Sequence, residues 1–506
     1  MMDEDQVGAI APAELSTQMI GRKASQGLRW SVLGILVVRV GNLGMGLVLA
    51  RLLAPADFGV YAIALAATDF VTRINDGGLV AATVQWRGRL DEMAPTVTTL
   101  TALFSAAVYG MFWFAAPSFA ALAGSPDAAP VVRLLTTTIL IDGVTALRVG
   151  TIMRNFQQDK IAKATVAGFV VNAVLAISLA FYGAGPYSFV GGLLAGAVVT
   201  GALLFVSAKV PFRIGFDRAI AVRLMRFGMP LAAGLGIEAI LLNTDYVVVG
   251  RIMGATALGF YLLAFNVSSW VQGVVGTAVR YVSVASFSRL AEQNEDVLSL
   301  GVQRSAPLLI AGILPVVMLM AVLAPSLVVF LYGGRWAPAA PVLRFLMVLT
   351  VVRLLTSFAT DILVSAGATR ATLWLNLGWV IALVPTLIIG TQLGGIRGTA
   401  IAHAIVAVLV AAPLAMWTLR RSRVRLAPIG PALVRPLLAM ALATVTCLAV
   451  VEMAPTSPVV QLATAGTAGL LVYVATAAPL AVLRRIGGRA RVLVLACHLP
   501  TSFWKG

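Results

Sequence analysis

The stretch VLARLLAPADFGVYAIA (residues 48–64) has a counterpart 200 residues later, VVGRIMGATALGFYLLA (residues 248–264). An ungapped comparison over residues 48–92 finds ten identities at this spacing, among them Arg51/Arg251, Gly59/Gly259, Tyr61/Tyr261 and Glu92/Glu292. The arginine, tyrosine and glutamate matches carry more weight than the valine matches, because apolar residues coincide readily in so apolar a chain. The pattern predicts an internal duplication with one copy in each half of the protein.

Composition sets the class of the protein. The chain has 506 residues, of which 60% are hydrophobic and 11% charged, and its mean hydropathy is +0.95. Soluble domains carry about 25% charged residues, so this composition indicates a polytopic membrane protein. Two cysteines and two histidines provide neither a disulfide framework nor, unaided, a zinc site. The polar, initially acidic N-terminus does not resemble a cleaved signal peptide.

We expect an all-α protein of about 14 transmembrane helices, because the sequence contains that many apolar stretches of about 20 residues. An even number places both termini on the same side, and six helices between equivalent positions give the two copies the same orientation. Such a parallel repeat is typical of transporters that bind substrate between their halves. The expected spans are 28–53, 59–84, 97–123, 131–152, 162–184, 186–208, 228–252, 259–287, 305–332, 340–365, 371–393, 396–419, 433–453 and 459–483.

The net charge of +17 is explained by topology. Of the 37 lysines and arginines, 27 fall in the tails and loops on the side of the termini and six on the other side. Basic residues accumulate in cytoplasmic loops, so this bias places both termini in the cytoplasm. The charge therefore provides no reason to expect nucleic acid as a partner.

The basic stretches also divide the chain. The segment KVPFRIGFDRAIAVRLMRF (209–227) alternates arginines with apolar residues and predicts an amphipathic helix at the membrane interface. The expected domains are a cytoplasmic tail (1–27), an N-lobe of six helices (28–208), the linker (209–227), a C-lobe of six helices (228–419), helices 13 and 14 (420–483) and a basic cytoplasmic tail (484–506).

Two segments carry a family resemblance. LARLLAPADFGVYAIALAATDFVTRINDGGLVAATVQ (49–85) and TDYVVVGRIMGATALGFYLLAFNVS (244–268) resemble the polysaccharide transporter family of Wzx-type lipid-linked oligosaccharide flippases, over roughly residues 24 to 420. The superfamily also includes multidrug/cation antiporters and the lipid II flippase. The resemblance implies two six-helix lobes around a central, often cationic cavity that opens alternately to either side. It implies undecaprenyl-diphosphate-linked sugars as cargo, helices 13 and 14 as a variable addition, and the bacterial plasma (inner) membrane as the location.

Three charges lie within the second span. Asp69, Arg73 and Asp76 fall at about 0°, 40° and 340° around a helix, a single stripe in which Arg73 can pair with both carboxylates. Lipid exposure would cost about 2.5–3.5 kcal/mol for each charge, so the stripe must face protein or water. Three interpretations remain open: an ion network that braces the helix against a neighbour, a cavity site for a polar head group, or placement near the cytoplasmic interface.

Three more arginines are candidates for the substrate diphosphate, because a guanidinium donates two charge-assisted hydrogen bonds at once. Arg39 is in the middle of the first span, and Arg280 in the eighth span is the corresponding candidate in the second lobe. The alternatives are pairing with a carboxylate for Arg39 and snorkelling to the interface for Arg280. In the tenth span Arg353 and Asp361 share a polar face that suits either a cavity or a brace.

Carboxylates in the second half are candidates for coupling or charge balance. Glu238 and Asp245 are seven residues apart on one helix face. They could hold a coupling proton or cation, or neutralise Arg39 and Arg280, and the second role is slightly favoured. Asp142 and His403 are isolated in their spans, so a structural role is expected for each. No metal site or cofactor is expected.

The expected function is therefore a flippase that moves polyprenyl-diphosphate-linked oligosaccharide to the outer leaflet, for exopolysaccharide or lipopolysaccharide O-antigen synthesis. The chain has no G-x-x-x-x-G-K-[ST] phosphate loop and no nucleophile–base set, which favours a transporter over an enzyme. Membrane voltage, a gradient of H⁺ or Na⁺, or downstream consumption of the product would supply the energy. Voltage supplies about 2.3 kcal/mol per charge per 100 mV. Membrane lipids and a polysaccharide polymerase are further expected partners.

Two alternatives are a multidrug/cation antiporter of the same superfamily and a membrane glycan polymerase or ligase. An antiporter would need a carboxylate-dominated, aromatic-lined cavity, against which the arginines argue. A polymerase usually needs a large external loop with catalytic groups, and the expected external loops are short.

Overall fold

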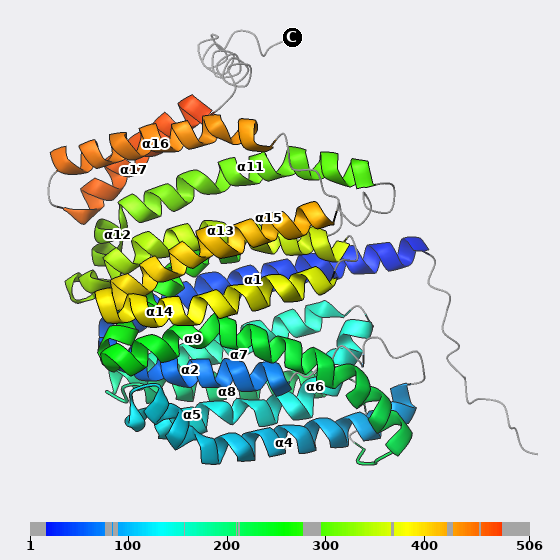
Figure 1. Cartoon of the computed structure of the whole chain (residues 1–506). Helices are drawn as coiled ribbons and strands as arrows, with labels where there is room; N and C mark the ends of the chain where they lie inside the picture. Colours follow the sequence, from blue (N-terminus) through cyan, green and yellow to red (C-terminus); the bar gives the residue numbers. More distant parts are fainter. Residues whose placement is uncertain are drawn as a thin grey trace, which may run out of the picture. The chain divides into compact units, whose positions relative to one another are not determined.

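A computed structural model of the chain describes residues 17–75, 83, 90–155, 157–208, 210, 213–276, 295–365, 369–422, 429–454 and 457–477. Every regular element in these residues is a helix (Figure 1). The chain forms two compact units, Met1–Asn243 and Thr244–Gly506. The all-α class expected from composition is confirmed for the described part of the chain.

The described residues of the first unit form seven α-helices, a short 3₁₀ helix and the first half of α9. The contacts pair α7 with α8 and with α1, α4 with α5 and α6, and α2 with α5 (Figure 1). The elements are α1 (Thr17–Leu52), α2 (Pro55–Asn75), α4 (Leu90–Leu122), η1 (Pro126–Ala128), α5 (Ala129–Thr136), α6 (Thr138–Arg154), α7 (Gln158–Phe181), α8 (Tyr187–Ser207) and α9 (Arg218–Val271).

The segment before α9 is anchored to α4. The backbone N–H of Gly215 donates to the hydroxyl of Thr99 over 3.2 Å, and the N–H of Asp217 donates to the hydroxyl of Thr96 over 3.0 Å. The Asp217 carboxylate then accepts hydrogen bonds from the N–H groups of Ala219 and Ile220, which caps the start of α9. The anchored segment leaves the basic residues that follow it at the exposed start of α9.

The second unit contains the rest of α9 and the helices that follow. Here α13 packs on α11, α14 and α15, and α16 packs on α17 and α11 (Figure 1). The elements after α9 are η2 (Gln272–Gly276), α11 (Glu295–Val322), α12 (Ala324–Tyr332), η3 (Gly334–Ala339), α13 (Ala340–Ser365), α14 (Thr369–Val406), η4 (Ala407–Ala411), α15 (Ala412–Arg421), α16 (Ile429–Met453) and α17 (Pro458–Ala477).

Glycines interrupt α9 and α14, the two longest helices among the described residues. The backbone of α9 leaves the helical region at Gly254, with φ 80° and ψ 175°, and α14 does so at Gly394 and Gly395. The φ angles of Gly254 and Gly395 are positive, which favours glycine because it has no Cβ to clash with the backbone. These breaks coincide with the turns that the sequence predicts between spans 228–252 and 259–287 and between spans 371–393 and 396–419.

Other expected spans are divided within the structure. Residues 131–152 belong to two helices, α5 and α6, and residues 305–332 to α11 and α12. The second division has a clear cause, because Pro325 lacks the N–H that an uninterrupted helix requires. Among the described residues, eleven helical stretches are long and apolar enough to cross a membrane. Many large apolar side chains on them are exposed, such as Phe114 at 81%, as expected of a multi-pass membrane protein.

Candidate functional site

Two residues of the charged stripe of α2, Asp69 and Arg73, contact each other. The Arg73 Nε lies 3.0 Å from Asp69 Oδ2, and both side chains are about one-third exposed. The amide of Asn243, on α9 in the same unit, donates to the same carboxylate oxygen over 2.8 Å. The structure thus brings Asp69 and Arg73 together as their spacing predicts, and it adds a partner 174 residues away that links α2 to α9.

Several other candidates are separate from this contact or fall outside the description. Arg39 lies on the exposed side of α1. Asp76 and Arg280 lie outside the described residues, and Glu238 is on α9 with its side chain outside the description. Their predicted roles at a diphosphate site or in charge balance therefore stay predictions.

In the second unit, Arg353 and Asp361 are on α13. The Arg353 side chain is half-buried, with its guanidinium carbon 5.0 Å from the ring centre of Phe265. Asp361 is buried, at 6% exposed. Arg353 lies close enough to Asp245 and His403 to act on both electrostatically. Arg353 and Asp245 thus belong to one charged neighbourhood inside this unit.

Asp245 is the centre of a fully buried polar cluster. Its side chain is 0% exposed, and its Oδ2 accepts a hydrogen bond from the Tyr261 hydroxyl over 2.9 Å. The Tyr261 oxygen lies 3.3 Å from Nδ1 of His403, and that nitrogen is 3.8 Å from Asp245 Oδ2. Tyr261 and His403 are 0% and 1% exposed. His403 therefore contacts residues of another helix, although it is isolated within its own span, and its expected structural role stays a prediction.

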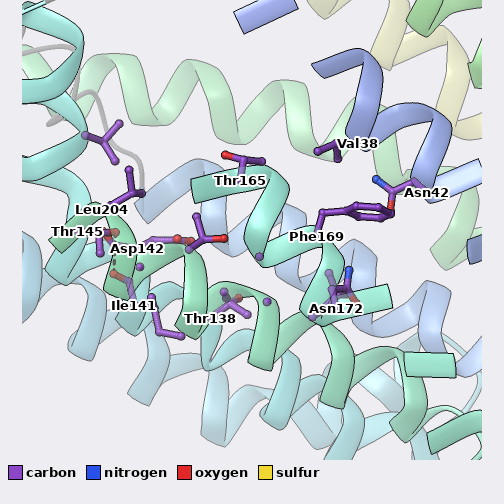
Figure 2. A pocket seen from close by; sticks show the side chains of 17 residues that line it. Val38, Asn42, Thr138, Ile141, Asp142, Thr145, Thr165, Phe169, Asn172 and Leu204 are labelled. Carbon is purple, nitrogen blue, oxygen red and sulfur yellow. Dashed lines mark hydrogen bonds between the residues drawn. The ribbon is translucent and has the colours of Figure 1, made fainter. Parts of the chain in front are cut away.

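A pocket of about 400 Å³ lies within the first unit, lined by α1, α6, α7 and α8. Figure 2 shows Asn42 and Phe169 near one end, and Asp142 and Leu204 near the other. Asn172 is 7% exposed, and its side-chain oxygen has no hydrogen-bond partner in the described structure. Asp142, expected from sequence to be isolated, thus lines a polar cavity.

Hydroxyl, amide and carboxyl groups line the pocket. Thr138, Thr145 and Thr200 donate their hydroxyl hydrogens to backbone carbonyls. Toward the cavity, these hydroxyl oxygens can therefore only accept hydrogen bonds. The lining contains one acid, Asp142, and no lysine or arginine. The pocket therefore offers hydroxyl and carboxyl oxygens beside the amide groups of Asn42 and Asn172.

Sequence reasoning missed this pocket, although a signal was present. Small and polar residues recur on α7 at positions 165, 168 and 172 and on α8 at positions 196, 197 and 200, each at helical spacing. These positions are uncharged on both helices, so an analysis of charged residues did not identify them. In the described residues, no group of three or more His, Cys, Asp or Glu side chains is arranged to hold a metal ion.

Comparisons with known proteins give the family. Residues 48–341 match the family described as polysaccharide biosynthesis protein. The chain is 28% identical over 335 residues to the succinoglycan biosynthesis transport protein ExoT of Rhizobium meliloti (strain 1021), covering 64% of this chain and 66% of that one. It is 23% identical to the lipopolysaccharide biosynthesis protein WzxC of Escherichia coli (strain K12), covering 76% and 79%. The first match spans about two thirds of its relative's length.

Solved structures give the fold. The lipid II flippase MurJ, in an inward closed conformation, matches with a TM-score of 0.72 at 13% identity, over 88% of this chain and 97% of that one. An inward-facing multidrug resistance transporter of the MATE family matches with a TM-score of 0.60 at 18% identity, over 76% and 94%. Because the family match covers more than half of its length, the chain belongs to the family of polysaccharide biosynthesis proteins.

Proposed function

We propose that this chain is a flippase that moves polyprenyl-diphosphate-linked oligosaccharide from the cytoplasmic to the outer leaflet of the bacterial inner membrane. The observation that carries the proposal is the family match over residues 48–341. Two relatives are named for succinoglycan transport and lipopolysaccharide biosynthesis, and the MurJ fold belongs to a protein named as a lipid flippase. The cargo thus combines a lipid anchor with a sugar head group.

The proposed topology has fourteen crossings with both termini in the cytoplasm. The excess of basic residues on the side of the termini supports this orientation. The breaks at Gly254 and Gly394–Gly395 support the number, because they lie where the sequence predicts the boundary between two adjacent crossings. The proposed domains are the two six-helix lobes (28–208 and 228–419), the linker (209–227), the helix pair (420–483) and the two cytoplasmic tails.

The proposed mechanism is alternating access. A cavity open to the cytoplasm takes the diphosphate onto arginine side chains, while the polyprenyl tail stays in lipid. The candidates are Arg39, Arg73, Arg280 and Arg353, with Asp69, Asp76, Glu238, Asp245 and Asp361 to balance their charge. Guanidinium groups suit this task because they bind phosphate oxygens bidentately. A change of conformation then exposes the head group on the outside, driven by voltage or an H⁺ or Na⁺ gradient.

The chain is proposed to transport without catalysing a reaction, and to deliver its cargo to a polysaccharide polymerase. A multidrug antiporter is the second candidate, favoured by the match to the MATE fold. That match is to a fold only, whereas the sequence relatives are named for polysaccharide pathways. Export of glycan and resistance to drugs are separate phenotypes, so measuring both in one strain distinguishes the flippase from the antiporter.

The test is a complementation experiment in a bacterium that lacks its own copy of this chain. Arg39→Gln and Arg280→Gln together should abolish export of the surface glycan while the folded protein stays at wild-type level. The control is Arg133→Gln, because the Arg133 guanidinium donates to the Trp113 carbonyl over 3.0 Å and Arg133 is not among the candidate substrate residues. Normal export by the double variant would rule out these arginines, and drug resistance without a glycan phenotype would favour the antiporter.

A further inference from the structure

The pocket of the first unit has polar groups on its wall that no protein partner satisfies. The Asn172 side chain is 7% exposed, and its Oδ1 has no hydrogen-bond partner in the described structure. Asn42 and Thr165 also line the pocket, and their side chains form no hydrogen bond within the described part of the chain. A buried polar atom without a partner is costly, so these groups point to a polar occupant of the pocket.

The wall offers donors and acceptors together. The amides of Asn42 and Asn172 offer both, whereas the hydroxyls of Thr138, Thr145 and Thr200 only accept. A sugar hydroxyl donates one hydrogen bond and accepts others, so several hydroxyls on one ring match such a mixed wall. A phosphate would call for basic side chains, and the lining has none. The wall therefore favours a neutral molecule rich in hydroxyl groups.

The size and the apolar part of the lining also suit a sugar. The volume of about 400 Å³ is at the lower end of the range of about 300–1,000 Å³ for small-molecule pockets, which fits a single sugar residue. Phe169, Leu193 and Leu204 contribute apolar surface for the C–H groups of a sugar ring. The Phe169 ring packs against Gly41 of α1, where a larger residue would clash, and closes one end of the pocket (Figure 2).

The pocket opens beside a candidate residue for the diphosphate. Asn42 and Thr165 are exposed, so the opening lies at these two side chains. Arg39 and Asn42 are three residues apart on α1, which places their Cβ atoms about 5–6 Å from each other on the helix surface. Arg39 is exposed as well. A diphosphate held by Arg39 would therefore bring the attached sugars to the opening of the pocket.

We propose that this pocket binds a neutral sugar residue of the lipid-linked oligosaccharide. The inference rests on the proposed flippase function and identifies a part of its substrate. The amides of Asn42 and Asn172 hold the sugar hydroxyls, the threonine oxygens accept from them, and Phe169 packs against the ring. An acidic sugar is disfavoured, because the lining offers its carboxylate no lysine or arginine and already contains Asp142.

The first test observes binding through a thiol at the opening. The reporter is Thr165→Cys in a protein without the native cysteines (Cys447→Ala, Cys497→Ser), in lipid nanodiscs and treated with a maleimide. The probes are polyprenyl diphosphates that carry glucose, galactose or N-acetylglucosamine. At ten times its Kd, at least one of them should slow alkylation about tenfold, because about one pocket in ten stays free.

Two controls show whether the sugar itself occupies the pocket. Polyprenyl diphosphate without a sugar, or with glucuronic acid, should leave the alkylation rate of Thr165→Cys unchanged. Lys163→Cys should not be protected by any probe, because Lys163 is exposed on the same helix but does not line the pocket. Equal protection by the sugar-free lipid, or no protection by any neutral probe, overturns the proposal.

The second test removes the hydrogen-bonding groups of Asn172. In the Thr165→Cys protein, Asn172→Leu should raise the Kd of the protecting probe by about two- to tenfold, the effect of losing one hydrogen bond. The matched control is Asn155→Leu, because Asn155 is exposed at the end of α6 and outside the lining. An unchanged Kd in Asn172→Leu overturns the proposal. Should this variant fail to fold, the protection pattern with Asn172 intact decides the question.

Flipping in proteoliposomes, measured with the same probes, separates the two proposals. If a neutral probe protects Thr165→Cys but the wild-type chain moves no probe between leaflets, the sugar pocket stands and the flippase function fails. If the wild-type chain moves the probes but none of them protects Thr165→Cys, the flippase function stands and the sugar pocket is overturned.

Discussion

The contact between α2 and α9 leads to a prediction about the charged stripe. Asn243→Leu removes the 2.8 Å hydrogen bond to the Asp69 carboxylate. A hydrogen bond to a charged group contributes about 1.5–3 kcal/mol when it is well protected. The Asp69 side chain is 34% exposed, so water can replace part of this bond. We therefore expect the free energy of unfolding of the first unit to fall by about 1 kcal/mol.

Thermal unfolding can be followed through a cysteine. Ala67 on α2 is 0% exposed, so an Ala67→Cys variant without the native cysteines (Cys447→Ala, Cys497→Ser) lets a thiol-reactive dye report unfolding of the first unit. For a unit of this size, 1 kcal/mol lowers Tm by about 2–4 °C. The control is Asn155→Leu, because Asn155 is exposed at the end of α6 and should leave Tm unchanged. Asp69→Asn should lower Tm less in the Asn243→Leu protein than in the wild type, since the two residues share one contact.

The result decides between the interpretations of the stripe. A lower Tm with a coupled double variant means that Asp69 braces α2 against α9. An unchanged Tm together with reduced lipid flipping would refute this reasoning, and would mean that Asn243 orients Asp69 for the substrate.

Three further predictions concern packing and the pocket. An added Cβ at Gly196 would lie 2.7 Å from a backbone carbonyl of α7, so Gly196→Val should cost about 1–3 kcal/mol and reduce the yield of folded protein; Gly110→Ala, with open space around it, should not. Tyr473→Phe removes a 2.7 Å hydrogen bond to the carbonyl of Ala311, which should destabilise the attachment of α17 to α11 by about 1 kcal/mol in a thermal unfolding assay. Asn172→Leu replaces a buried oxygen without a partner, so Tm should rise, and a fall would mean that a water or an ion satisfies this oxygen.

The features that sequence predicted are those with a local cause. Asp69 and Arg73 are one helical turn apart, so their pairing follows from helix geometry alone. The turns near Gly254 and Gly394 follow from the length of an apolar span and from the backbone freedom of glycine. Membrane class follows from composition, because no soluble core could bury so much apolar surface.

The features that sequence missed depend on residues far apart in the chain. Asn243 meets Asp69 across 174 residues, and His403 meets Tyr261 across 142 residues. Periodicity specifies which face of a helix a residue occupies, but it does not specify the helix that packs against that face. His403 therefore looked isolated until its neighbours were placed. The pocket around Asn172 was missed for a second reason, because most of its lining residues are small or uncharged.

The measurement that tests the central claim most directly is flipping of a labelled polyprenyl-diphosphate oligosaccharide by the purified chain in proteoliposomes. The label begins in one leaflet, and a membrane-impermeant quencher reports its arrival in the other. We predict that the wild-type chain moves the label much faster than protein-free vesicles do, and that Arg39→Gln with Arg280→Gln removes this activity. Equal rates with and without the folded protein, under a pH gradient and a membrane potential, would contradict the assignment as a flippase.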